Sequence, residues 1–191
     1  MEVKVTSEAG WVDALIGMSY SYYKGDTPVD TWWEGQRDRA IHRAKVLAFK
    51  GGGHNKFLES IGIWVDVNAS RAFWSEFDTY RAGITKQSTS TMHTLSKREP
   101  RASDFEDGTP VGVISAFHAH WVKYKNDVVL LKHGLPEAFM QRRRIATNYK
   151  SLQNIITQRR GHRFKFWDTF IDAVLEQCEH PYYLEQEKTN E

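Results

Sequence analysis

The stretch that most constrains the fold passes from strict alternation to helical spacing with no linker between the two. Its alternating apolar residues, which predict a strand with one buried face, are Ile61, Ile63, Val65 and Val67. Apolar residues then recur at helical spacing at Ala69, Ala72, Phe73, Phe77 and Tyr80. Asn68 separates the two patterns, and asparagine is a favoured helix N-cap. The sequence therefore predicts a strand that passes directly into a helix capped by Asn68.

One acidic side chain interrupts the apolar face of that helix. Glu76 lies among these apolar residues, and Arg81 and Gln87 follow just past the expected helix end. Moving a carboxylate into the interior costs several kcal/mol unless the charge is paired. We therefore expect Glu76 to have a charged partner or to bind a ligand.

Composition limits the classes of protein to which the chain can belong. Its 191 residues are 40% hydrophobic, which predicts one globular domain over residues 1–191. Twenty-six basic against 24 acidic residues leave a net charge of +2, which argues against a polymeric nucleic acid as partner.

The single cysteine, Cys178, cannot form an internal disulfide and lies at helical spacing with apolar residues, which predicts a buried thiol. Without an apolar run that could span a bilayer, we expect a soluble, cytoplasmic protein with no membrane partner.

Two other segments contain histidine or glycine patterns with more than one interpretation. Gly51–Gly53 precede His54 and are either a phosphate-binding loop or a helix terminator, and no Lys-Ser or Lys-Thr pair follows, which favours the terminator. From Thr109-Pro110, apolar residues repeat by three and four as far as Leu131, which predicts one long amphipathic helix in the core or at a subunit contact. His118 and His120 would lie on nearly opposite sides of it, so we expect no metal site.

The basic segments near the C-terminus suggest anion binding. Arg142, Arg143 and Arg144 form either a solvated face or a short strand whose two sides alternate, with one side holding a phosphate. Asn148 is expected to cap a helix from Tyr149 to Arg159, with Arg159 continuing its apolar face. Arg159 could extend along the rim of that face. Because a basic loop follows at once, an anion ligand is the preferred role for Arg159.

These motifs resemble those of the flavin-dependent thymidylate synthases. His54 and Glu59 match the H-x-x-x-x-E pair of that family, and the family pattern can be followed without a gap from His54 to Arg81. The spacing of the pattern is kept, but several residues in its second half differ from those of the family. Glu76 stands where the family has Gln, Thr79-Tyr80-Arg81 where it has Arg-His-Arg, Lys86-Gln87 for Asn-Glu, Thr89 for Ser, and Thr91-Met92 for Arg-Tyr. A second match, to a run that begins with Asn and leads to a His, consists of Asn148, Lys150, Leu152, Asn154, Arg159 and His162.

The resemblance, closest to divergent members of the family from tailed-phage genomes, implies a fold and an activity. The fold would be α+β, with an antiparallel sheet flanked by long helices, as a homotetramer whose active sites lie between subunits. The activity would be C5 methylation, or a related C5 alkylation, of dUMP or a similar pyrimidine deoxynucleotide. Methylene-tetrahydrofolate would supply the carbon, FAD would be the cofactor, and NADPH the reductant.

The same resemblance implies roles for individual residues and assigns no catalytic nucleophile. Substrate-binding residues would be Glu76, Gln87, Thr89, Arg142, Arg143, Arg144 and Arg159. Cofactor-binding residues would be His54, Thr79, Tyr80, Arg81, Asn148, Asn154 and His162. Replacing a family arginine with Thr79 removes a charge-assisted hydrogen bond, which is worth roughly 1.5 to 3 kcal/mol. The alternative is a degenerate family member that binds a nucleotide or a protein partner without flavin chemistry.

Overall fold

The computed structural model describes residues 1–186, which form two compact units. Unit 1 comprises Met1–Val3, Asp66–Arg81 and Lys86–Ile145. Unit 2 comprises Lys4–Val65, Ala82–Thr85 and the described chain from Ala146 onward. Four of the five boundaries between the units fall within a β-strand, and the fifth lies between Arg81 and Ala82, so the chain passes repeatedly from one unit to the other.

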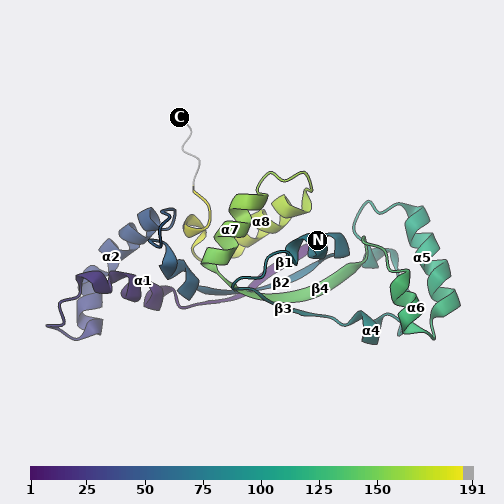
Figure 1. Ribbon diagram of the computed structural model, residues 1–191, viewed down its shortest axis with the longest axis horizontal. Helices are drawn as coiled ribbons and strands as arrows, with labels where there is room; N and C mark the ends of the chain where they lie inside the picture. Colours follow the sequence, from purple (N-terminus) through teal and green to yellow (C-terminus); the bar gives the residue numbers. More distant parts are fainter. Residues whose placement is uncertain (187–191) are drawn as a thin grey trace. The chain divides into compact units, whose positions relative to one another are not determined.

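Within residues 1–186, the strands form a four-stranded sheet in the order β1-β2-β4-β3 (Figure 1). The strands are β1 (Glu2–Ala9), β2 (Gly62–Ser70), β3 (Thr85–Ser88) and β4 (Met140–Asn148). Next to the ends of β2 and β4, the Tyr149 amide donates to the Ile61 carbonyl at 3.0 Å, and the Arg71 amide donates to the Phe139 carbonyl at 3.0 Å. Residue numbers thus rise along one strand as they fall along its neighbour, so this pair is antiparallel.

Strand β2 confirms the alternation predicted for it. Ile61, Ile63, Val65 and Val67 are all at most 1% exposed. The predicted cap is wrong, because β2 continues through Asn68 to Ser70. Helix α3 (Arg71–Phe77) begins only there, and the Ser70 hydroxyl accepts a hydrogen bond from the Phe73 amide at 3.4 Å. Asn68 and Ala69 therefore belong to the strand, and the cap lies two residues later than expected.

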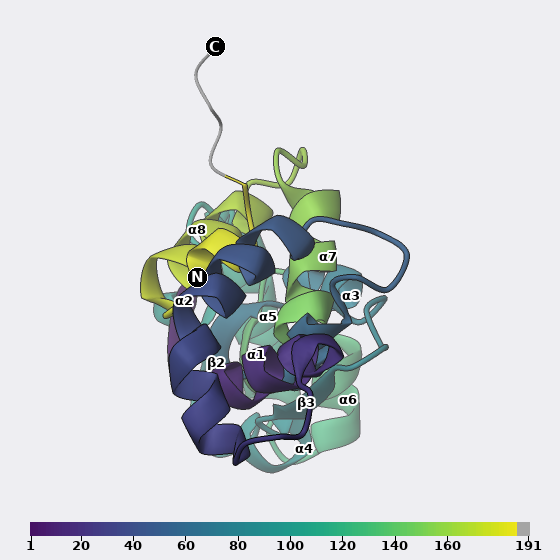
Figure 2. The same cartoon turned by 90° about the vertical axis from the view of Figure 1, so that its left-hand side faces the viewer.

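Unit 2 consists of helices together with the parts of the strands that fall within its residues. Its helices are α1 (Trp11–Ser19), α2 (Val29–Leu47), α7 (Tyr149–Arg159) and α8 (Phe166–Gln177), with the 3-10 helices η1 (Tyr20–Tyr22), η2 (Lys56–Ser60) and η4 (Pro181–Tyr183). Helix α1 packs against α2 and η2, and α7 packs against η2 and α8. The cartoon in Figure 2 is viewed from the side of α1 and α2.

Helix α7 has the bounds that its sequence predicted. The Asn148 side chain accepts a hydrogen bond from the Ser151 amide at 2.9 Å, which confirms it as the N-cap. Cys178 is buried after the end of α8, as expected. Burial raises the pKa of its thiol to about 11, so the thiol is protonated at neutral pH. No helix in residues 1–186 combines the length and the apolar character needed to cross a membrane.

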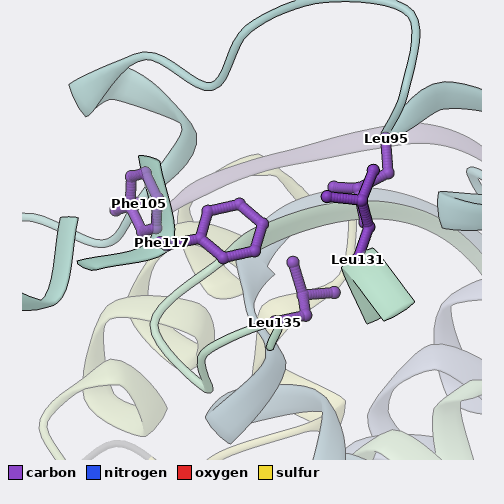
Figure 3. Close-up of a cluster of buried hydrophobic side chains, with 5 residues drawn as sticks. All are labelled: Leu95, Phe105, Phe117, Leu131 and Leu135. Carbon is purple, nitrogen blue, oxygen red and sulfur yellow. The ribbon is translucent and has the colours of Figure 1, made fainter. Parts of the chain in front are cut away.

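Unit 1 contains a second hydrophobic cluster. Its helices are α3, α4 (Thr91–Thr94), α5 (Val111–Tyr124) and α6 (Val128–His133), with the 3-10 helix η3 (Ala102–Asp104). Figure 3 shows the buried side chains that gather here, namely Leu95, Phe105, Phe117, Leu131 and Leu135. The Phe105 and Phe117 rings meet edge to face, with their centroids 6.0 Å apart.

The single long helix predicted from Thr109-Pro110 to Leu131 is two helices. Helix α5 ends at Tyr124, and α6 begins at Val128. The Asp127 side chain accepts hydrogen bonds from the Val129 and Leu130 amides, both at 3.1 Å. Its carboxylate therefore caps a new helix, while the apolar spacing continues across the break.

Candidate functional site

A cavity of about 1350 Å³ lies within unit 2. Its walls are formed by α1, by η1, by α2 and by the segment from Gly52 to Ser60. Small-molecule sites usually occupy about 300 to 1,000 Å³. The cavity is therefore large enough for a ligand with more than one ring system.

Helix α2 presents a basic face to this cavity. Arg39, His42, Arg43 and Val46 line it. Arg39 lies three and four residues before His42 and Arg43, and Val46 lies three residues after Arg43, so they share one side of the helix. The buried residues Ala40 and Ala44 occupy the adjacent side and fix the helix against the core. Lys50, just past the helix end, also lines the cavity.

The glycine run turns the chain back toward the same cavity. Gly52 and Gly53 have φ values of 67° and 83°, a left-handed conformation that glycine adopts without strain. Asn55 then anchors the loop, because its buried side-chain amide donates to the Ala48 carbonyl at 3.1 Å. His54 and Glu59, the pair that resembles a family motif, both line the cavity with exposed side chains. Helix α2 already ends at Leu47, with Ala48 as its C-cap, so the predicted helix terminator is wrong and the run forms a turn after the helix.

Aromatic rings form another part of the wall. Tyr20 and Tyr22 line the cavity and are 51% and 59% exposed. The Arg43 guanidinium carbon lies 3.9 Å from the centroid of the Tyr22 ring, a cation–π contact. Behind them, the Tyr23 and Trp32 rings pack with centroids 5.1 Å apart. Rings and guanidinium groups together suit a ligand that is planar in part and anionic in part.

The cavity has a small excess of positive charge. Four cationic side chains line it, namely Arg39, Arg43, Lys50 and Lys56, against three acidic ones, namely Asp13, Asp38 and Glu59. In the described part of the chain, none of these cations forms an ion pair with a carboxylate. Unpaired cations beside exposed rings leave this wall able to bind an anion.

The arginine run on β4 differs from the cavity cations, because each of its guanidinium groups is already paired within unit 1. The three residues alternate along the strand, with Arg142 and Arg144 exposed and Arg143 half-buried. Arg142 forms an ion pair with Glu2. Two guanidinium nitrogens of Arg144, Nε and Nη2, each donate to one carboxylate oxygen of Asp66 at 2.7 Å. The run is therefore on a strand with two different sides, as the second alternative required, and the phosphate site on one side stays a prediction.

Arg143 has the most constrained position of the three. One of its terminal nitrogens lies 3.0 Å from both oxygens of Asp78, and its guanidinium carbon lies 4.5 Å from the centroid of the Trp74 ring. Lys86 also pairs with Asp78, at 2.9 Å. Burial acts to raise the pKa of Asp78, but the hydrogen bonds from Lys86 and Arg143 outweigh it, and the pKa lies below its usual value.

The other predicted residues of unit 1 lie on or after α3. Glu76 is half-buried near the end of the helix, and the Thr79 hydroxyl donates to the Glu76 carbonyl at 2.7 Å. The Tyr80 ring packs edge to face on Phe77, with centroids 6.2 Å apart, and Arg81 is exposed. Both side chains that replace family residues, at Thr79 and Tyr80, thus make contacts within the unit.

Strand β3 carries the exposed Gln87 and is followed by Thr89. The Thr89 amide donates to the Arg142 carbonyl at 3.0 Å, and the Thr89 hydroxyl donates to the same oxygen at 3.3 Å. The Gln141 side chain donates to the Thr89 carbonyl at 2.8 Å. The structure therefore brings Thr89 and Arg142 together through backbone pairing.

In unit 2, Arg159 and His162 lie together at the end of α7. One Arg159 nitrogen lies 3.3 Å from His162 Nε2, and the Arg159 guanidinium carbon lies 4.9 Å from the centroid of the buried Trp167 ring. Asn148 caps the start of the same helix, while the exposed Asn154 accepts a hydrogen bond from Gln158 at 3.0 Å. Arg159 is half-buried and rests on an aromatic ring, and it retains a polar partner.

The sequence interpretation missed most of the cavity wall. Of the predicted site residues, His54 lines the cavity, whereas Arg39, His42, Arg43 and Tyr22 were not predicted at all. A signal was present in the spacing of the basic residues on α2, which places them on one helix face. Among residues 1–186, no group of three or more His, Cys, Asp or Glu side chains is placed to hold a metal ion.

Comparison with known proteins identifies the fold. No protein-family model matches the chain, and no curated protein matches it. A crystal structure of the flavin-dependent thymidylate synthase ThyX from Helicobacter pylori, complexed with FAD and dUMP, is similar with a TM-score of 0.76 and 16% sequence identity, covering 97% of this chain and 98% of that one. A second structure of ThyX from the same organism, also with FAD and dUMP, has a TM-score of 0.70 and 18% identity, covering 97% of each chain. The chain therefore has the flavin-dependent thymidylate synthase fold, which confirms the predicted α+β class with an antiparallel sheet.

Proposed function

We propose that the chain catalyses flavin-dependent C5 methylation of dUMP or a closely related pyrimidine deoxynucleotide. The observation that carries the proposal is the cavity in unit 2, where exposed rings and cations without a carboxylate partner in residues 1–186 line a space beside His54 and Glu59. It occurs in a chain whose fold matches, over 97% of its length, a protein solved with FAD and dUMP. Methylene-tetrahydrofolate would supply the carbon and NADPH the electrons.

The cavity suits FAD by its chemistry. A dinucleotide carries a negatively charged diphosphate and planar rings, and the cavity offers guanidinium and ammonium groups together with tyrosine rings. When bound, FAD would supply the hydride transfer, and the protein would supply positioning and charge. His54 and Glu59 would orient the cofactor, since both side chains are exposed on the cavity wall and neither is buried in the core.

Arg159 is the residue that we propose for the nucleotide substrate. Its guanidinium is held against Trp167, which restricts its rotation, and it contacts His162. A guanidinium stacked on a ring still presents its edge to a phosphate or a base oxygen. Arg142, Arg143 and Arg144 each form an ion pair with a carboxylate of unit 1, so each would have to contact an incoming phosphate beside that carboxylate.

The remaining predicted residues keep supporting roles in this proposal. Asn148 would hold the start of α7 in place, and Asn154, which is exposed on the same helix, would face the cofactor. Glu76, Gln87, Thr89 and Arg81 would reach a ligand bound by another copy of the chain. That requirement leads to a homotetramer with active sites between subunits, as the resemblance implies.

A second candidate function is nucleotide binding without flavin chemistry. The contacts of Thr79 and Tyr80 favour it, because both side chains are used within unit 1 and neither carries a charge. Such a protein would bind dUMP and would not retain FAD. The two candidates therefore differ in one measurable property, the affinity for the flavin.

Incubation of the purified protein with FAD, methylene-tetrahydrofolate, NADPH and dUMP tests the proposal. We expect mass spectrometry of the nucleotide to detect dTMP, or another C5-alkylated product, only when FAD is present. An Arg159→Gln variant should form less product and bind dUMP about tenfold or more weakly, since a hydrogen bond to a charged group is lost. Binding of dUMP with no product and no bound FAD would favour the second candidate.

A further inference from the structure

We propose that Arg43 and Tyr22, with Arg39, hold the adenosine-diphosphate half of the flavin cofactor in this chain. The inference rests on the proposed function, which requires FAD, and it goes further by assigning the binding of the adenosine-diphosphate half to particular residues of η1 and α2. None of the three belongs to the motifs that resemble the family. Their side chains would bind the negatively charged diphosphate, which Thr79 and Tyr80 cannot do because neither carries a charge.

The contact between Arg43 and Tyr22 is the first observation that supports this assignment. The guanidinium lies 3.9 Å above the centroid of the tyrosine ring, so its orientation is fixed before any ligand arrives. A guanidinium stacked in this way keeps its edge nitrogens available for paired hydrogen bonds to phosphate oxygens. Tyr22 itself is 59% exposed, so a second planar group has room to stack on the ring.

The spacing along α2 is the second observation. Arg39 lies four residues before Arg43, so their Cβ atoms are neighbours on one helix face, about 6 Å apart. Both line the cavity, and neither forms an ion pair among the described residues. Two guanidinium groups one helical turn apart can reach the two phosphates of one diphosphate.

The acidic residues of the wall help to define the class of ligand. Asp13, Asp38 and Glu59 also line the cavity, so a long polyanion would meet repulsion along part of its length. A ligand that concentrates its charge in one diphosphate and continues as uncharged rings avoids that repulsion. This pattern matches the adenosine diphosphate half of a flavin dinucleotide joined to its flavin ring.

Titration with three ligands tests the assignment. FAD and ADP both contain the adenosine-diphosphate group, and FMN contains the flavin with a single phosphate. We expect ADP to compete with FAD for the wild-type protein. Arg43→Gln should weaken FAD and ADP binding by about tenfold to a hundredfold, because a charge-assisted hydrogen bond is removed, and should weaken the binding of FMN, which carries a single phosphate, less than that of ADP.

Matched variants keep the test independent of folding. Tyr22→Leu should weaken ADP binding, and Tyr22→Phe should retain it, since phenylalanine keeps the ring. Arg37→Gln removes an exposed arginine of α2 that does not line the cavity, and its affinities should equal those of the wild type. Thermal melting of each variant, monitored by circular dichroism, checks that the fold is intact.

The outcomes separate this inference from the proposed function. Wild-type FAD affinity in Arg43→Gln and Tyr22→Leu would overturn the assignment while leaving flavin-dependent activity possible. Equal losses of FMN and ADP affinity would also overturn it, since the effect would not be confined to the adenosine-diphosphate half. A wild-type protein that binds neither FAD nor ADP would overturn both proposals.

Discussion

At the scale of single residues, pairing decides which charges are available to a ligand. Arg143 and Arg43 both lie against aromatic rings, but Arg143 also contacts the Asp78 carboxylate, whereas Arg43 lines a cavity with no carboxylate partner among the described residues. An arginine that is already neutralised binds an added anion less strongly. The basic run that is most conspicuous in the sequence is therefore the less suitable anion site.

Asp78 should stabilise unit 1 through its two basic partners. Its pKa is lowered, so the folded state binds fewer protons than the unfolded state as the pH falls through the acid range. The stabilisation is present above the unfolded pKa of about 3.9 and is lost as the pH falls through the lower folded pKa. Because the Asp78 side chain is 45% exposed, solvent screening limits the contribution to about 1 kcal/mol.

Asp78→Asn should accordingly lower the free energy of unfolding at pH 7 by about 1 kcal/mol. The variant should differ less from the wild type at about pH 2, where the wild-type carboxylate is protonated. Urea unfolding at both pH values measures the difference. A constant difference across the two pH values would contradict the ion-pair explanation.

His180 should make unit 2 less stable as the pH falls. Burial lowers the pKa of its imidazole, against the opposing effect of the Glu8 and Glu179 carboxylates. The ring stacks on Trp11 with centroids 4.4 Å apart, and its Nδ1 is hydrogen-bonded to the Tyr182 hydroxyl at 3.0 Å. Below the unfolded pKa of about 6.5, the unfolded state binds more protons, so the free energy of unfolding decreases as the pH falls.

His180→Phe keeps a ring beside Trp11 and removes the titrating group. We expect its free energy of unfolding to change less between about pH 7 and pH 5 than that of the wild type. His93→Gln, at an exposed position, is the control and should keep the wild-type pH dependence. If both variants retained the same slope, His180 would not be the group responsible.

At the scale of elements, local patterns predicted the presence of strands and helices better than their ends. The alternation from Ile61 to Val67 correctly predicted β2, but pairing with β4 extends the strand past Asn68, and pairing between distant segments leaves no local signal. Apolar spacing likewise continued across Asp127, where a side-chain cap begins a new helix. Helix α7 was predicted with its correct bounds because its cap, Asn148, acts within four residues of chain.

The same reasoning applies to the candidate site. The glycine run was correctly excluded from the helix by its residues alone, but the helix ends before it, at Leu47. The basic face of α2 could have been found from its spacing. That Glu2, Asp78 and Asp66 would neutralise the arginine run could not have been predicted, because these partners lie 140, 65 and 78 residues away in sequence.

Asn148 should stabilise α7 through its capping hydrogen bond. Asn148→Ala removes the acceptor of the Ser151 amide, and such losses cost about 1 kcal/mol. Asn154→Ala, an exposed position on the same helix, is the matched control and should change stability far less. Chemical unfolding of both variants measures the loss of stability. Equal losses in the two variants would contradict a stabilising role of the capping hydrogen bond.

At the scale of the whole molecule, the proposed function requires several copies of the chain. Val111, Val122 and Val129 on α5 and α6 are 77%, 53% and 52% exposed, and we expect them to pack against another copy. We expect light scattering to give a mass near four times the 22.2 kDa of one chain. Val111→Lys combined with Val122→Lys should reduce that mass if these helices form the contact, and a wild-type monomer would contradict the tetramer directly.

The cavity between α1, α2 and the His54 loop is the site proposed here for a dinucleotide cofactor. Crystals of the protein soaked with FAD and dUMP would show whether it is. We expect electron density for FAD in this cavity, with its diphosphate beside Arg43 and with His54 and Glu59 in contact with the cofactor. An empty cavity in crystals whose FAD is bound elsewhere, or is absent at saturating concentration, would rule out this site.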